Sequence, residues 1–128
     1  MTTFTPFLTF AGKQNGKAEE AVRLYTSLFP DSKISSLVKR PDGTVMHAVF
    51  SLSGQSFMAS DGGTQHAWTF TPGVSIFITF ASEDELTRAF AKLSEGGDVK
   101  MPLDNYGFSK KFGWTDDRYG VSWQLNLR

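Results

Sequence analysis

The chain contains no cysteine among its 128 residues. Disulfide bonds, thiolate metal sites and cysteine nucleophiles are therefore excluded. Thirteen basic and thirteen acidic residues give a formal net charge of zero, so the basic surface that attracts nucleic acid or an anionic membrane is missing. No apolar run approaches the roughly 20 residues of a membrane span, and the first residues lack the pattern of a signal peptide. We therefore expect a cytoplasmic protein whose partners are small molecules or a second copy of itself, with no nucleic-acid or membrane partner.

Phenylalanine, in contrast, is abundant. The chain has 12 phenylalanines, and 40% of its residues are hydrophobic. A chain of this length buries roughly two thirds of its unfolded surface, which is enough to fold without disulfide support. We expect one domain, residues 1–128, in which aromatic packing supplies much of the core.

The first half of the chain has the pattern of a strand, a helix and three further strands. Residues 5–10 alternate as a short strand, and residues 12–16 form a turn. Apolar residues then recur at three- and four-residue intervals from Ala18 to Phe29, which predicts an amphipathic helix that ends before Pro30. The three strands expected next cover residues 33–39, 44–52 and 55–60.

The second half repeats this order after a connector at residues 61–73. Residues 74–80 predict a strand, and Ser82 with Glu85 has the spacing of a helix capping box. The helix that follows ends near Gly96 and Gly97. Further strands are expected at residues 99–103, 110–115 and 121–127. The repeat predicts an α+β fold of two tandem βαβββ modules, at about residues 4–61 and 73–127.

The last strand has two chemically different faces. Alternation places Trp123, Leu125 and Leu127 on one face, and Ser122, Gln124 and Asn126 on the other. One face therefore packs on a core, and the other is expected to line a polar space.

Several short segments carry a resemblance to a known family. They are TPFL at 5–8, AEEA at 18–21 followed by Tyr25, FP at 29–30, MPL at 101–103, GW at 113–114 and DRYGVSWQ at 117–124. With these segments the chain resembles the PhnB-like branch of the vicinal oxygen chelate superfamily, which includes glyoxalase I, bleomycin-resistance proteins and extradiol dioxygenases. The branch is also labelled 3-demethylubiquinone-9 3-methyltransferase-like. The resemblance implies a curled mixed sheet in each module, its helix on the convex side, a cleft on the concave side, and a homodimer.

Catalytic members of this superfamily hold a divalent metal with side chains from the first and last strands of each half. The resemblance places Thr5, Met58, Ser75 and Gln124 at or near those positions. None of them is His, Asp or Glu, the residues whose lone pairs bind transition metals well. We therefore expect no metal site and no cofactor. The methyltransferase label is not expected to describe the activity, because the chain lacks a glycine-rich strand-to-helix turn in a parallel sheet.

Three other residues were considered as ligands. Asp61 and His66 lie five residues apart and could approach a ligand at the mouth of the cleft. Alternatively, Asp61 begins a turn and His66 is a solvated loop residue. Turn chemistry favours this second interpretation. His47 is interpreted as a half-buried strand residue with a hydrogen-bonding neighbour rather than as a ligand.

Alternation also predicts which side chains line the cleft. Thr5 and Phe7 share a face with each other, as do Ser75 and Phe77, so phenylalanine walls are expected beside hydroxyl and amide groups. Such a surface suits a small, partly apolar ligand. The same phenylalanines would equally suit a core or a dimer interface. The expected binding residues are Thr5, Phe7, Met58, Ser75, Phe77, Trp114 and Gln124, and no catalytic residue is identified.

These observations favour a PhnB-like small-molecule binding protein without a catalytic metal. The alternative is a glyoxalase- or dioxygenase-like, metal-dependent lyase, isomerase or oxygenase. Whether the protein is an enzyme stays open, because neither a metal site nor a general base is evident in the sequence.

Overall fold

The structure is a computed structural model that describes all residues, 1–128. The chain divides into two compact units, Met1–Thr69 and Phe70–Arg128, and each unit is described by itself. Neither helix is long and apolar enough to cross a membrane.

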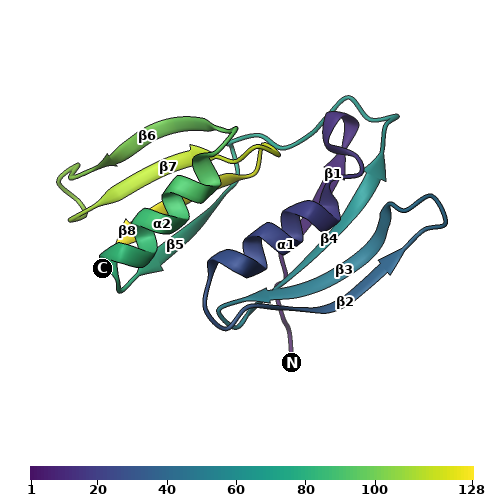
Figure 1. Cartoon of the computed structure of the whole chain (residues 1–128), viewed down its shortest axis with the longest axis horizontal. Helices are drawn as coiled ribbons and strands as arrows, with labels where there is room; N and C mark the ends of the chain where they lie inside the picture. The colour runs from purple at the N-terminus through teal and green to yellow at the C-terminus, as the bar shows by residue number, and fades with distance from the viewer. The chain divides into compact units, whose positions relative to one another are not determined.

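Unit 1 consists of one four-stranded sheet and one helix (Figure 1). Its elements in chain order are β1 (Phe7–Ala11), the short 3-10 helix η1 (Gly12–Gln14), α1 (Ala18–Leu28), β2 (Lys33–Lys39), β3 (Val45–Leu52) and β4 (Gln55–Gly63). The strand order is β1-β4-β3-β2, in which β1 runs parallel to β4 and the other pairs are antiparallel.

Unit 2 repeats this arrangement. Its elements are β5 (Ser75–Phe80), α2 (Glu83–Ser94), β6 (Asp98–Asp104), β7 (Phe112–Asp116) and β8 (Ser122–Leu127). The strand order is β5-β8-β7-β6, with β5 parallel to β8. The predicted α+β fold of two βαβββ modules is therefore confirmed.

Three strand boundaries differ from the prediction by two residues or more. β1 begins at Phe7 rather than at residue 5, although the Pro6 carbonyl still accepts a hydrogen bond from the Met58 amide. β4 continues to Gly63 because β1 pairs with it as far as Ala11, across an irregularity in the register. β7 begins at Phe112 rather than at residue 110.

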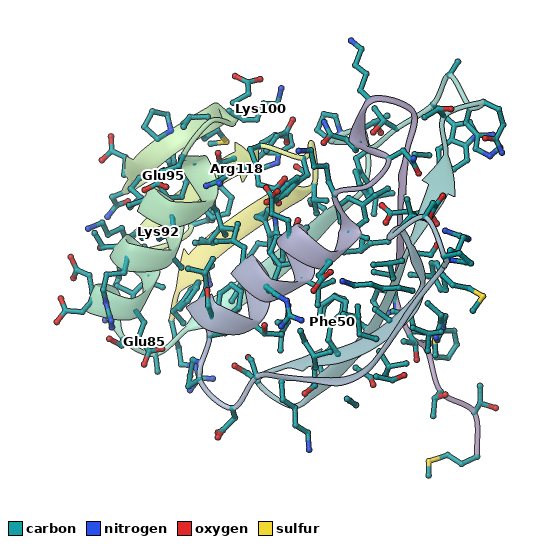
Figure 2. The ribbon with its side chains drawn as sticks, turned by 45° about the vertical axis from the view of Figure 1, so that its right-hand side comes forward. Phe50, Glu85, Lys92, Glu95, Lys100 and Arg118 are labelled. Atoms are coloured by element: carbon teal, nitrogen blue, oxygen red, sulfur yellow. The ribbon has the colours of Figure 1, made fainter.

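In unit 1 the helix packs on one face of the sheet through its apolar stripe. Ala18, Ala21, Val22 and Tyr25 of α1 are buried, and Phe50 of β3 is fully buried on the sheet (Figure 2). Apolar side chains buried at i, i+3, i+4 and i+7 are typical of a helix whose stability comes from tertiary packing.

Asp61 holds the start of α1 to the sheet. Its Oδ1 accepts hydrogen bonds from the backbone amides of Gly16 (2.7 Å) and Ala18 (3.1 Å), and its Oδ2 accepts one from Val45 (2.8 Å). The side chain of the N-cap residue, Lys17, makes no capping bond, so this distant carboxylate supplies the acceptor instead. The interpretation of Asp61 as the first residue of a turn is wrong, because Asp61 lies within β4, with 1% of its surface exposed.

In unit 2 the predicted N-cap residue, Ser82, is confirmed at the start of α2. The Ser82 hydroxyl accepts a hydrogen bond from the Glu85 amide over 3.2 Å. Leu86, Ala89, Phe90 and Leu93 form the buried stripe, as their spacing predicts.

Candidate functional site

Each sheet has one face covered by its helix and one face without a helix. On β8, Trp123 and Leu125 are fully buried, whereas Gln124 and Asn126 keep part of their surface exposed. The predicted division of β8 into an apolar and a polar face is confirmed. Ser122, the remaining polar residue, is nevertheless buried.

The helix-free face of unit 2 is the candidate site. The strand register places side chains from three adjacent strands on it: Ser75, Phe77 and Thr79 of β5, Ser122, Gln124 and Asn126 of β8, and Phe112, Trp114 and Asp116 of β7. This register brings together three of the predicted binding residues. Gln124 of β8 lies between Phe77 of β5 and Trp114 of β7 and is paired with both.

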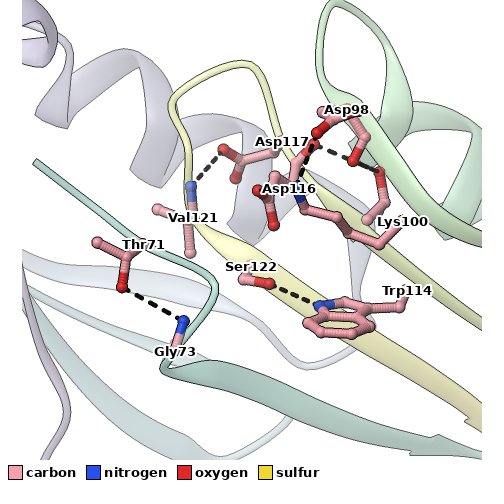
Figure 3. Close-up of polar contacts among 10 residues, drawn as sticks. Thr71, Gly73, Asp98, Lys100, Trp114, Asp116, Asp117, Val121 and Ser122 are labelled. Carbon is pink, nitrogen blue, oxygen red and sulfur yellow. Dashed lines mark hydrogen bonds and ion pairs between the residues drawn. The ribbon is translucent and has the colours of Figure 1, made fainter.

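Two side-chain hydrogen bonds order the polar part of this face. The Gln124 amide nitrogen donates to the Ser75 hydroxyl over 2.7 Å, across the parallel strands β5 and β8. The Trp114 indole donates to the Ser122 hydroxyl over 2.7 Å (Figure 3). The amide oxygen of Gln124 accepts no hydrogen bond, so it remains available to a ligand donor.

Aromatic rings gather at one end of the same face. Phe112 is 3% exposed, and its ring is surrounded by Phe108 (centroid distance 4.9 Å), Tyr106 (6.1 Å) and Phe77 (6.2 Å). Phe77, Tyr106, Phe108 and Phe112 form the aromatic cluster. Phe77 and Phe108 keep 55% and 64% of their surface exposed, so the cluster presents open ring surface. The Tyr106 hydroxyl donates to the Pro102 carbonyl, which fixes the segment that carries the two outer rings.

A carboxylate lies at the other end of this face. Asp116 is paired with Ser122 in the register and follows Trp114 by two residues. Its Oδ2 lies 3.5 Å from the Lys100 ammonium group, which is closer to Asp98 (2.8 Å), while its Oδ1 is buried without a hydrogen-bond partner. The hydrogen bond from Lys100 to Asp98 raises the pKa of Lys100, and the charge of Asp116 adds to this effect.

Sequence reasoning did not single out Asp116. Alternation along β7 was the available signal, because it places Asp116 on the same face as Trp114. The ion pair with Lys100 depends on the pairing of β6 with β7, which periodicity alone does not specify.

The corresponding face of unit 1 is less polar. Phe7 lies opposite Met58 in the register, just as Phe77 lies opposite Gln124, and Phe7 keeps 47% of its surface exposed. Thr5 lies before β1 and is half-buried. His47 is half-buried in β3, as interpreted from the sequence, and its ring lies 5.9 Å from the Phe7 ring.

Asp61 and His66 do not form a shared polar site. All three hydrogen bonds to the Asp61 carboxylate come from backbone amides, and His66 stacks on Trp68 with ring centroids 4.7 Å apart. A hollow of about 270 Å³ lies in unit 1 beside Arg40, whose Nη1 donates to Thr44 Oγ1 and to the carbonyls of Val45 and Asp61. This arginine braces the β2–β3 turn.

The residues at the superfamily's metal positions fit a metal poorly. Ser75 and Gln124 are bonded to each other, Met58 offers a thioether, and Thr5 offers a neutral hydroxyl. Neutral hydroxyls and amides are weak metal ligands unless carboxylates or imidazoles accompany them. No group of three or more His, Asp or Glu side chains is placed to hold an ion.

Comparison with known proteins agrees with this architecture. A solved structure described as a putative 3-demethylubiquinone-9 3-methyltransferase, PhnB protein, from Bacillus cereus is 47% identical and covers 99% of this chain and 100% of that one, with a TM-score of 0.93. A glyoxylase/bleomycin resistance protein/dioxygenase domain from Frankia sp. EAN1pec is 21% identical, covers 99% of this chain and 97% of that one, and has a TM-score of 0.66, which shows a shared fold.

A curated relative is Protein YjdN of Escherichia coli (strain K12), which is 25% identical over 87 residues. The match spans 68% of this chain and 58% of the length of that protein. The sequence profile of the 3-demethylubiquinone-9 3-methyltransferase family matches residues 2–126, nearly the whole chain. The chain therefore belongs to this family, with the glyoxalase/bleomycin resistance fold that its PhnB-like relatives share.

Proposed function

We propose that this protein binds a small, partly apolar molecule on the helix-free face of unit 2 and does so without a catalytic metal. Phe77 and Trp114 provide apolar contact, and Gln124 and Ser75 provide hydrogen bonds. On unit 1, Thr5, Phe7 and Met58 offer a related but more apolar surface.

The observation that carries the proposal is the position of Phe77 beside Gln124. An aromatic ring with 55% of its surface exposed lies next to an amide whose nitrogen is fixed by Ser75 and whose oxygen is unused. Ligand sites typically combine apolar walls with a few well-oriented polar groups. A hydrogen bond that already orients the amide lowers the entropy cost of binding.

The chemistry of the donors supports binding without a metal. A catalytic metal in this fold would need strong ligands from the first and last strands, whereas in unit 2 these strands offer a neutral hydroxyl, Ser75, and a neutral amide, Gln124. We therefore assign these two side chains to direct contact with the ligand.

We also propose that the protein forms a homodimer. Phe7 and Val38 expose 47% and 43% of their surface on the helix-free face of unit 1, and exposed apolar residues gathered on one sheet face are typical of an interface. Light scattering during gel filtration tests this proposal, because a dimer has twice the chain mass of 14.2 kDa. A mass of one chain at micromolar concentration would contradict it.

The binding proposal is tested by a fragment screen followed in ¹⁵N–¹H NMR spectra, with the protein kept in EDTA. We expect partly apolar fragments to shift the Trp114 indole and Gln124 side-chain signals. Shifts that require an added divalent metal, or that map only to the helices, would contradict it. The Gln124→Leu variant, which keeps similar bulk without the amide, should lose the polar hits and keep the apolar ones.

A further inference from the structure

We propose that the ligand of unit 2 is an aromatic molecule that carries an amine, with its ring on the aromatic cluster and its N–H groups directed to Asp116. This inference rests on the proposed binding function and specifies the chemistry of the ligand. It follows from the contrast between the aromatic cluster at one end of this sheet face and the carboxylate of Asp116 at the other.

The first observation is the contrast between two consecutive aspartates. Asp117 accepts hydrogen bonds from the amides of Tyr119 (2.9 Å) and Val121 (3.0 Å) and from the indole of Trp123 (2.9 Å). Asp116 has one long contact with Lys100, and its Oδ1 is the only buried side-chain nitrogen or oxygen atom in the chain that lacks a partner (Figure 3). The Asp116 side chain as a whole keeps 14% of its surface exposed, so a ligand N–H that donates to this carboxylate would supply a donor that it lacks.

The second observation is the local charge. Lys100 faces two carboxylates, those of Asp98 and Asp116, which leaves a net charge of minus one at this end of the face. The nearby guanidinium of Arg118 is directed to Glu95 at 3.5 Å and so does not compensate for it (Figure 2). A positively charged ligand group is therefore attracted, and a carboxylate is repelled.

The third observation is the open ring surface at the opposite end. Phe77 and Phe108 lie over the buried Phe112 with most of their faces free, and the Tyr106 ring lies nearly parallel to Phe108, at 18°. A further ring can stack there or meet an exposed edge, and such aromatic pairs add binding energy beyond the area they bury.

The register links these two ends. Phe112, Trp114 and Asp116 alternate along one strand, so the first and last Cα atoms are roughly 13 Å apart at about 3.3 Å per residue. The amide of Gln124 lies between the two ends on the next strand, opposite Trp114, whereas Ser122 lies opposite Asp116 at the carboxylate end. A ring and an amine joined by a chain of about four carbon atoms are therefore suited to this face.

Three probes that differ only in the terminal group test this inference: 4-phenylbutylamine, 4-phenyl-1-butanol and 4-phenylbutanoate. Their dissociation constants at pH 7 are measured from NMR shifts of the Trp114 indole in the whole chain. We expect the amine to bind about fivefold to tenfold more tightly than the alcohol, and the carboxylate to bind most weakly.

Two variants separate the two ends. Asp116→Asn keeps the shape of the side chain and should reduce the advantage of the amine over the alcohol to less than about twofold, whereas Asp84→Asn on the outer surface of α2 should leave it unchanged. Phe108→Ala should weaken all three probes by a similar factor of about three to ten. Because Phe108 is exposed, this variant should fold even if Asp116→Asn does not.

The outcomes distinguish this inference from the binding proposal. Equal affinities for all three probes, or a preference for the carboxylate, would overturn the amine assignment and leave a binding face in place. Failure of all three probes to shift Trp114 would overturn the aromatic amine as ligand class. The binding proposal itself fails only if the wider fragment screen also finds no hit on this face.

Discussion

The side-chain amide of Gln124 donates a hydrogen bond to the hydroxyl of Ser75 over 2.7 Å, from the last strand of unit 2 to the first. The bond joins two predicted binding residues that lie 49 positions apart in the sequence. It orients the amide and engages the Ser75 hydroxyl as its acceptor.

Gln124→Ala should remove this bond and the amide at once. We expect the free energy of unfolding to fall by about 1 kcal/mol, because the bond is only partly buried. The affinity for hydrogen-bonding fragments should fall by about tenfold. Urea titration and the NMR binding assay measure the two effects, and an unchanged affinity would remove Gln124 from the site. Thr79→Ala, on the same face away from this bond, is a matched control.

Asp61→Ala should be among the most destabilising single substitutions in unit 1. It leaves three amide donors, those of Gly16, Ala18 and Val45, without an acceptor in a buried place. We expect a loss of about 3 kcal/mol or more in the free energy of unfolding, measured with urea.

Ser82→Ala is the matched control for this substitution, because Ser82 caps the other helix with a single hydrogen bond. It should cost only about 1 kcal/mol. Equal losses for the two variants would show that Asp61 acts as an ordinary surface cap.

The βαβββ repeat followed from the sequence because each element carries a strong local signal. The stripe from Leu86 to Leu93 and the capping residue Ser82 predict α2 without reference to the rest of the chain. The alternation in β8 gave the correct face to Trp123 and to Gln124 for the same reason.

The interactions of Asp61 and Asp116 were missed because they depend on pairing between distant segments. The Asp-Gly-Gly sequence at residues 61–63 favours a turn, but pairing with β1 extends the strand through it. The partner of Asp116, Lys100, comes from β6, and no periodicity in the sequence indicates which lysine will lie near this carboxylate. Sequence patterns therefore predicted on which face of a strand each side chain lies, whereas the partners of charged side chains depend on tertiary contacts.

Gly97→Ala should disturb unit 2 strongly. A methyl group at this position would collide with the backbone carbonyl of Asp116, which cannot move without breaking the β6–β7 pairing. We expect a loss of about 3 kcal/mol in the free energy of unfolding. We also expect a shift in the NMR signals of Trp114, which lies two residues before Asp116 on β7. Gly43→Ala is the comparison, because the added carbon meets no neighbouring atom there although the backbone has a positive φ. Its loss of unfolding free energy measures the cost of the backbone conformation without a collision.

Asp42 should titrate at a lower pH than an ordinary aspartate. Hydrogen bonds from the Thr44 hydroxyl and amide hold the pKa of Asp42 below its usual value of 3.8. Because the pKa is lowered in the folded state, the stabilisation is fully present above the unfolded-state pKa. It is lost as the pH falls through the folded-state pKa.

Carbon-13 NMR of the Asp42 carboxyl group measures this value directly. Thr44→Val removes the hydroxyl donor, so it should move the pKa of Asp42 upwards. An unchanged pKa in that variant would show that the hydroxyl hydrogen bond does not cause the shift.

The most direct test of the account is a crystal structure of the EDTA-treated protein with the strongest fragment bound. We predict ligand density on the helix-free face of unit 2, in contact with Phe77 and with the amide oxygen of Gln124, and without a metal between ligand and protein. Density for an ion held by three or more protein side chains, or a fragment bound only on the helical side, would contradict the account.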